Sequence, residues 1–224
     1  MALNVNYTKE RHTGRWVFFI TLIAFLAVCG WYGYKWYTTG DVPFSLPIAS
    51  ANAAIDESSV SSSQISSYTV EAGKPRYISI PTLSVGDTRI FPVALDAGNQ
   101  IETPANINDA SWYNKSATPG SGGVVLISGH AIGMNHDGAF KQLGTLIAGA
   151  RINITRGDGK VFIYEVVENK TMTLDEVSAT GMKTLGQSVV SDKEGLNIIV
   201  ADGKWVPRLG TFDRRIILRA TIVE

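Results

Sequence analysis

The residues best suited to acid–base chemistry are histidines, and the chain has only three of them. His130 follows a continuous apolar run, residues 124–128, in the sequence Ile-Ser-Gly-His. A run of this kind bounded by glycines is consistent with a buried strand. We therefore expect the imidazole of His130 at a strand end, where a rigid scaffold can present a catalytic group. His136 lies further on, in a loop rich in Gly, Asn and Asp, and His12 belongs to the N-terminal tail.

A metal site is the second chemistry that these residues could support. His130, His136 and Asp137 are of the types that bind zinc, but their spacing matches no familiar ligand motif. The chain contains one cysteine, Cys29, so a Cys-based zinc site and an intramolecular disulfide are both excluded. We therefore expect no cofactor and no metal. A metal-assisted hydrolase using His130 and His136 stays an alternative.

A pair of arginines is the third feature that could carry chemistry. Arg214 and Arg215 open the last apolar run of the chain, residues 214–223. Side chains alternate between the two faces of a strand, so one of the pair points to each side. One guanidinium could then face a cleft while the other is solvated. A guanidinium stays charged and donates several hydrogen bonds, which suits it to a bound carbonyl or an oxyanion.

These groups belong to a region of short β-rich segments, residues 75–224, whose size suits one domain. Gly157-Asp158-Gly159 predicts a tight hairpin turn, and residues 139–146 are the best candidate for a short helix. Strands at this spacing predict a mainly β fold, a closed antiparallel barrel with short helices. The expected strands cover residues 76–80, 88–95, 124–128, 150–155, 160–168, 196–200 and 214–223.

The segment before this domain, residues 38–74, differs in composition. Large apolar residues are sparse there, and nine serines fall between residues 45 and 67. This composition predicts a flexible tether. Over the whole chain, 20 Lys and Arg balance 20 Asp and Glu. A zero net charge argues against a nucleic-acid-binding protein, so no nucleic-acid partner is expected.

The N-terminal part predicts a single membrane anchor, residues 16–37. Residues 16–34 hold no charged side chain, and as a helix they would span about 28 Å, close to the hydrocarbon thickness of a bilayer. Aromatic side chains crowd both ends of the run, as at membrane interfaces. A buried core helix and a cleaved signal peptide are the alternatives. A buried core helix tolerates more polar residues than this run contains. A signal peptide has a shorter apolar core followed by small residues, so a retained anchor is favoured.

The charges beside the apolar run predict its orientation. Lys35 is the only basic residue between the run and Lys74. The basic residues before the run are Lys9, Arg11 and Arg15. Because the more basic flank stays in the cytoplasm, we expect residues 1–15 there and the C-terminal domain outside the cell. Cys29 then lies within the membrane, as a small apolar filler rather than a reactive thiol.

The order and spacing of the motifs resemble the sortase family, most closely its classes E and F. The resemblance covers residues 78–220, and an anchor, a tether and a β-barrel are the parts that sortases have. The motifs that carry it are ISIPTLSV at 78–85, WYNKSATPGSGGVVLISGHA at 112–131, GAFKQLGTL at 138–146, YEV at 164–166, and GKW through TFDRRIILRA at 203–220.

The resemblance implies an activity and its partners. Sortases are membrane-bound cysteine transpeptidases of the cell surface. They cut a sorting signal of the Leu-Pro-x-Thr-Gly type and pass the acyl group to an amine of a cell-wall precursor or a pilin. A Cys nucleophile, a His and an Arg carry the reaction. By motif, His130 takes the histidine role and Arg215, rather than Arg214, takes the arginine role.

The nucleophile position is occupied by Ala201. The family pattern Thr-Leu-x-Thr-Cys falls on residues 197–201, which read Asn-Ile-Ile-Val-Ala. No thioacyl intermediate can form on a methyl group, so the chain is expected to be inactive as written. Ser128 is interpreted as a strand-end hydroxyl, and Asp202 should point away from the face of Ala201.

Two origins of Ala201 stay open. It is either a natural loss in a degenerate sortase or a deliberate replacement of the cysteine. The alternative function is a non-catalytic module that binds sorting signals or regulates an active paralogue.

Overall fold

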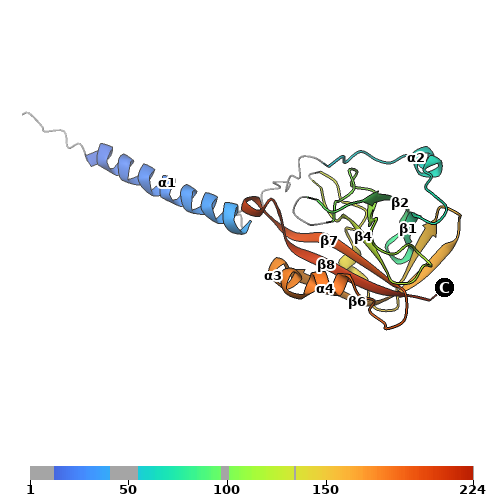
Figure 1. The fold of residues 1–224 in the computed structure, drawn as a ribbon. Coiled ribbons are helices and arrows are strands. Elements are labelled where there is room, and N and C mark those ends of the chain that lie inside the picture. Colours follow the sequence, from blue (N-terminus) through green and yellow to red (C-terminus); the bar gives the residue numbers. More distant parts are fainter. Residues whose placement is uncertain (1–12, 41–54, 97–100, 134, 224) are drawn as a thin grey trace, which may run out of the picture.

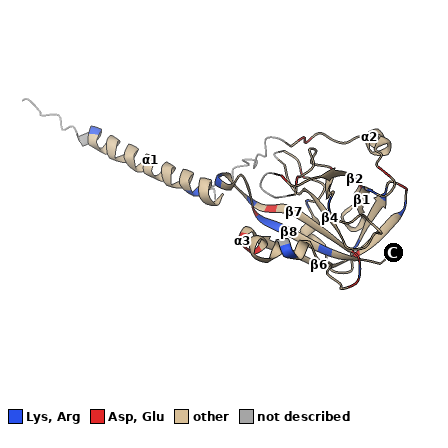
Figure 2. Cartoon of the chain, in the orientation of Figure 1, with Lys and Arg blue, Asp and Glu red and all other residues tan. Residues whose placement is uncertain are grey.

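The computed structural model describes residues 13–40, 55–96, 101–133 and 135–223. Its first element, helix α1 (Thr13–Thr39), projects away from the rest of the chain (Figure 1). Within it, Arg15–Thr39 is long and apolar enough to cross a membrane, and its apolar window is not buried against the protein. Figure 2 shows the charges of this helix confined to its two ends. The apolar helix expected from the sequence is therefore present.

Eight strands close into one barrel in the order β1-β2-β3-β4-β7-β8-β6-β5. Six of the pairings are antiparallel, whereas β2–β3 and β4–β7 are parallel. The strands are β1 (Pro75–Ile80), β2 (Val85–Val93), β3 (Ala110–Tyr113), β4 (Val124–His130), β5 (Arg151–Arg156), β6 (Val161–Thr173), β7 (Gly195–Val206) and β8 (Thr211–Ile222).

The closed, mainly β barrel predicted from the sequence is confirmed, with two differences of detail. The barrel is mixed rather than wholly antiparallel, because β2 pairs in parallel with β3 and β4 pairs in parallel with β7. Strand β3 was not predicted, since it has only four residues and no clear alternation. The hairpin turn between β5 and β6 forms as expected, with Gly159 at a φ of 82° that favours glycine.

The barrel has an apolar interior and a second, smaller apolar cluster on its outer face. On β7, Ile198 and Val200 belong to the interior, whereas Ile199 packs in the outer cluster with Ile217 of β8 and Val177. The alternation of β7 therefore places residue 201 on the outer face, together with residue 199.

The outer cluster is covered by a short helical segment between β6 and β7. It runs through α3 (Leu174–Glu176), the π-helical turn η3 (Val177–Gly181) and α4 (Met182–Leu185). The buried side chain of Asn197 on β7 donates from Nδ2 to the carbonyl oxygens of Leu185 (2.8 Å) and Gln187 (3.1 Å). The end of the segment is thereby tied to β7.

The helix expected at residues 139–146 is reduced to one 3-10 turn, η2 (Leu143–Thr145). Phe140 and Leu143 are both fully buried in the barrel core. Phe140 also packs against Gly129 of β4 so closely that a Cβ at that glycine would overlap its ring. Burial of these side chains outweighs the helical preference of the segment.

Part of the predicted tether lies on the barrel. The backbone N–H of Asp56 donates to the carbonyl of Ala105 (2.8 Å), and that of Ile107 donates to the carbonyl of Asp56 (2.9 Å). Helix α2 (Ser62–Ser67) follows, and the carbonyl of Ile65 accepts from the hydroxyl of Tyr77. Residues 38 and 39 of the predicted tether belong to α1 instead, and its residues 41–54 lie outside the described residues. The remaining short helices are η1 (Pro81–Leu83) and η4 (Pro207–Leu209).

Candidate active site

Three neighbouring strands bring the sequence-predicted site residues into one row. In the parallel pair β4–β7, His130 is the partner of Ala201. In the antiparallel pair β7–β8, Ala201 is the partner of Arg215. Adjacent strands lie about 4.8 Å apart, so Ala201 has the imidazole strand on one side and the guanidinium strand on the other. Residues far apart in the sequence thus meet on the outer face of the barrel.

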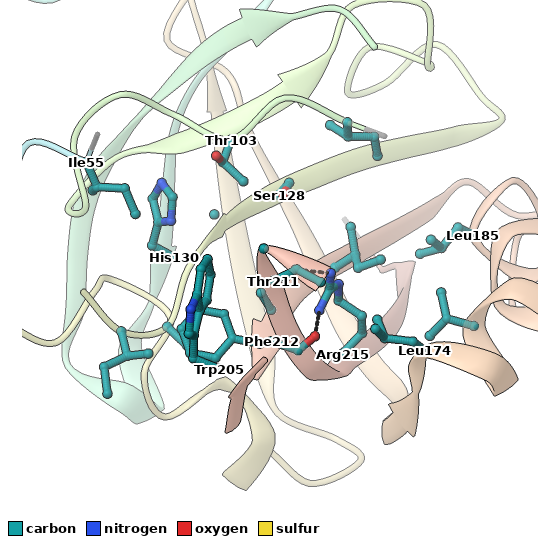
Figure 3. A pocket seen from close by; sticks show the side chains of 18 of the residues that line it. Ile55, Thr103, Ser128, His130, Leu174, Leu185, Trp205, Thr211, Phe212 and Arg215 are labelled. Carbon is teal, nitrogen blue, oxygen red and sulfur yellow. Dashed lines mark hydrogen bonds between the residues drawn. The ribbon is translucent and has the colours of Figure 1, made fainter. Parts of the chain in front are cut away.

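A cavity of about 580 Å³ lies over this row, and His130, Ala201 and Arg215 all line it. One wall is the helical segment, through Leu174, Val177 and Leu185, and the opposite wall comes from the β7–β8 connection. Figure 3 shows His130 and Arg215 on either side of Trp205, Phe212 and Thr211. The volume falls in the range of sites that hold small ligands or short peptide segments.

His130 is held in place by the backbone. Its side chain is 7% exposed, and its Nε2 lies 2.8 Å from the carbonyl oxygen of Pro104. A carbonyl oxygen only accepts, so Nε2 carries the proton and Nδ1 is left as an acceptor. Burial lowers the pKa of His130, and the Pro104 carbonyl opposes this shift. The ring is therefore neutral near pH 7 and able to accept a proton.

Arg215 is buried without a carboxylate partner among the described residues. It is 8% exposed. Its Nη1 donates to the carbonyls of Phe212 (2.9 Å) and Arg214 (2.8 Å), and Nη2 donates to Oγ1 of Thr211 (2.8 Å). Burial lowers the pKa of Arg215 and the charge of Asp213 raises it. The ordinary arginine pKa is so high that the group stays charged.

The hydrogen bonds of Arg215 leave part of its donor capacity open. A guanidinium has five N–H groups, and the three bonds to Phe212, Arg214 and Thr211 use three of them. The Nε–H and one Nη2–H have no acceptor assigned among the described residues. A fixed positive charge with unused donors beside a cavity can bind a peptide carbonyl or stabilise an oxyanion.

Ala201 contributes no chemistry of its own. Its side chain is a methyl group at the centre of the row. Ser128 lines the same cavity and lies on the same face of β4 as His130, two residues away. Asp202 is not among the lining residues, and neither is Arg214, which is exposed. The alternation of β7 and β8 separates these two side chains from the cavity.

The proposed metal pair is not brought together. His136 is largely exposed, and its Nδ1 lies 3.3 Å from a carboxylate oxygen of Glu57. It does not line the cavity that holds His130. Within residues 13–40, 55–96, 101–133 and 135–223, no group of three or more His, Cys, Asp or Glu residues could hold a metal ion. Cys29 lies exposed on α1.

Several residues of the site carry no signal in the sequence. The carbonyl of Pro104, which positions His130, is a backbone group that any residue offers. Thr211 stands four residues before Arg215 and accepts from it at the start of β8, directly after a tight turn with Gly210 at a φ of 61°. Ile55, from the predicted tether, also lines the cavity. Trp205 belongs to a motif of the sequence resemblance, but its place in the wall was not predicted.

Comparison with known proteins decides the family. A family model described as "Sortase domain" matches residues 78–223. The chain belongs to the sortase family. This confirms the resemblance seen in the sequence, whereas the assignment to classes E and F stays a prediction. No curated protein matches the chain.

Solved structures of sortases resemble the barrel at low sequence identity. Sortase A from Corynebacterium diphtheriae matches with a TM-score of 0.49 and 20% identity, over 75% of this chain and 73% of that chain. A sortase D5 transpeptidase of Clostridium perfringens gives 0.46 and 20%, over 67% and 79%. Sortase C1 of Streptococcus agalactiae gives 0.49 and 17%, over 74% and 78%.

Proposed function

We propose that this sortase binds a sorting-signal peptide in the cavity between the helical segment and the β7–β8 connection. The observation that carries the proposal is the row of His130, Ala201 and Arg215 under one cavity. In the family reaction, a thiolate at the position of Ala201 would attack the threonine carbonyl carbon. The unused N–H groups of Arg215 would donate to the carbonyl oxygen. Nδ1 of His130 would take the proton of the cysteine thiol and return it to the leaving amine as the C–N bond breaks.

The chain as written lacks the step that forms a covalent intermediate. Ala201 has no nucleophilic atom, and loss of the nucleophile from a comparable catalytic triad costs on the order of 10⁶ in rate. Binding depends on the cavity and on Arg215, which are intact. The proposed activity of this chain is therefore recognition without transpeptidation, whereas the family activity needs a cysteine at this position. The acceptor amine of that reaction would be a cell-wall precursor or a pilin.

Calorimetric titration with sorting-signal peptides tests the proposed binding. The full chain in detergent should bind a Leu-Pro-x-Thr-Gly peptide, and mass spectrometry after prolonged incubation should show the peptide uncut. A peptide of the same composition in scrambled order is the control. Equal binding of both peptides, or binding of neither by a folded protein, would contradict the proposal.

The helix α1 is proposed as the membrane anchor of this sortase, with residues 1–15 in the cytoplasm and the barrel outside. Support comes from its uncharged stretch, residues 16–34, and from the basic residues Lys9, Arg11 and Arg15 before that stretch. Protease added outside intact cells should digest the barrel and leave a tag placed before residue 1 protected. Digestion of the tag while the barrel stays protected would contradict this orientation and indicate the opposite one.

A further inference from the structure

The C-terminal end of α1 is in direct contact with the β7–β8 connection. Gly40, which follows the helix with a φ of 72°, lies so close to this hairpin that a Cβ there would overlap the carbonyl oxygen of Trp205. Its backbone N–H donates to the carbonyl of Trp36 (2.9 Å), which continues the helical bonding of α1. Figure 1 shows the helix meeting the barrel at this end of β7 and β8. The barrel is thus placed on the anchor through one hairpin.

The length of α1 sets the depth of this contact if α1 crosses the bilayer as proposed above. The uncharged stretch up to Tyr34 accounts for about 28 Å, nearly the whole hydrocarbon core. The five residues from Lys35 to Thr39 add about 8 Å, roughly the thickness of one headgroup layer. Gly40 and the adjoining hairpin therefore lie at the outer headgroup surface.

The side chains of the hairpin suit that position. At its tip, η4 exposes Arg208 and also Leu209, an apolar side chain that is 48% exposed. Figure 2 shows both blue and red segments at the end of β7 and β8 that meets α1. Within the described residues 35–40 and 202–214, basic side chains outnumber acidic ones: Lys35, Lys204, Arg208 and Arg214 against Asp202 and Asp213. An exposed apolar residue among basic ones is typical of a surface that binds anionic lipid headgroups.

We propose that residues 204–210 form a second membrane contact, which binds the phospholipid headgroups of the bilayer that α1 crosses. Leu209 enters the headgroup layer, and Arg208 pairs with lipid phosphates. Trp205, Gly210 and Thr211 also line the cavity. The contact therefore fixes the mouth of the active site beside the membrane surface, so the cavity receives peptides that are themselves held near the bilayer. This inference rests on the proposed membrane anchor.

Site-specific fluorescence quenching tests the contact. In a Cys29→Ala background, single cysteines replace Leu209, Phe25 in the middle of α1, and Lys160, and each carries an environment-sensitive dye. Lys160 is exposed at the opposite end of the barrel. The length of β8 puts it about 40 Å from Leu209. The full chain is reconstituted in vesicles of phosphatidylcholine and phosphatidylglycerol that contain lipids spin-labelled near the headgroup or deep in the acyl chain.

The proposal predicts a distinct quenching pattern for each position. The dye at Leu209 should be quenched about twofold or more by the shallow spin label, the dye at Phe25 by the deep label, and the dye at Lys160 by neither. A dye on a cysteine that replaces Arg208 should be quenched in the same way as the dye at Leu209. This second position controls for a local disturbance caused by labelling Leu209. Quenching at Phe25 with none at Leu209 and Arg208 would overturn the second contact alone. No quenching at Phe25 would overturn the anchor, and the inference with it.

Discussion

At the scale of single residues, the site depends on two charged or titratable groups that the fold holds in place by backbone atoms. Pro104 positions His130 through its carbonyl, and the first residues of β8 position Arg215 through the carbonyls of Phe212 and Arg214. Neither group uses a carboxylate partner among the residues that the structure describes. The charge of Arg215 and the acceptor nitrogen Nδ1 of His130 are therefore available to a ligand.

Replacing Arg215 should weaken peptide binding strongly. A charge-assisted hydrogen bond contributes about 1.5–3 kcal/mol, so Arg215→Ala should raise the dissociation constant of a sorting-signal peptide about 10- to 150-fold. Arg214→Ala is the matched control, because Arg214 is exposed and outside the cavity. Calorimetry on both variants, after thermal unfolding has shown that they are folded, measures the difference. Similar losses in both would remove Arg215 from the binding site.

His130 should make the barrel less stable as the pH falls. Burial lowers its pKa in the folded state, so below the ordinary histidine pKa near 6.5 the unfolded chain binds the proton more readily than the folded chain. Folding stability is then lost as the pH falls from about 6.5 towards the folded-state pKa, at up to about 1.4 kcal/mol per pH unit. Above about 6.5 the group has no effect, because it is neutral in both states.

Urea unfolding of the detergent-solubilised protein at pH 7 and pH 5 measures this effect. Between pH 7 and pH 5, the free energy of unfolding should fall less in His130→Gln than in the unmodified chain, because the variant has no buried imidazole to protonate. The carboxylates contribute equally in the two proteins. His136→Gln is the control, since His136 is largely exposed. The same pH dependence in all three proteins would show that His130 is not held neutral by burial.

At the scale of elements, the position of His130 depends on how β4 packs on the loop that follows it. Gly129 leaves room for the ring of Phe140, which is fully buried. The N–H of Phe140 donates to the carbonyl of His130 (3.1 Å), so the same loop fixes the end of the strand. Glycine is needed at this point because the ring and the strand approach too closely for a side chain.

Gly129→Ala should therefore destabilise the protein by about 1–3 kcal/mol, the usual cost of an overpacked core. Gly86→Ala in β2 is the matched control: its added methyl would meet no atom within 4 Å, and its effect should be neutral or slightly stabilising. Equilibrium unfolding in urea compares the two. A harmless Gly129→Ala would mean that Phe140 does not pack against β4 as described.

At the scale of the whole molecule, sequence patterns predicted the barrel better than its connectivity. Glycine and proline bounded the apolar runs clearly, and the Gly157–Gly159 turn had a recognisable signature. The parallel pairing of β4 with β7 has no recognisable pattern in the local sequence, because these strands are separated by a whole hairpin and a helical segment. The short β3 and the buried Phe140 loop were missed or misread for a related reason: tertiary packing decides their structure.

The residues of the site also fall into a group that the sequence predicted and a group that it did not. His130, Arg215 and Ala201 were named from family motifs, and the structure places them together in one row. Residues that complete the cavity, such as Thr211 and Ile55, come from a turn and from the predicted tether. Their contribution depends on how distant segments pack, so it could not be predicted from local sequence.

The central claim, that Ala201 stands at the nucleophile position of a sortase site, is tested most directly by restoring the sulfur. Ala201→Cys in a Cys29→Ala background should form a covalent adduct with a sorting-signal peptide that carries a thiol-reactive group, detected as a mass increase of the intact protein. The guanidinium of Arg215 should lower the pKa of the new thiol, so adding Arg215→Ala should abolish rapid labelling and adding Arg214→Ala should not. A folded Ala201→Cys protein that forms no adduct, or reacts equally with a scrambled peptide, would contradict the account.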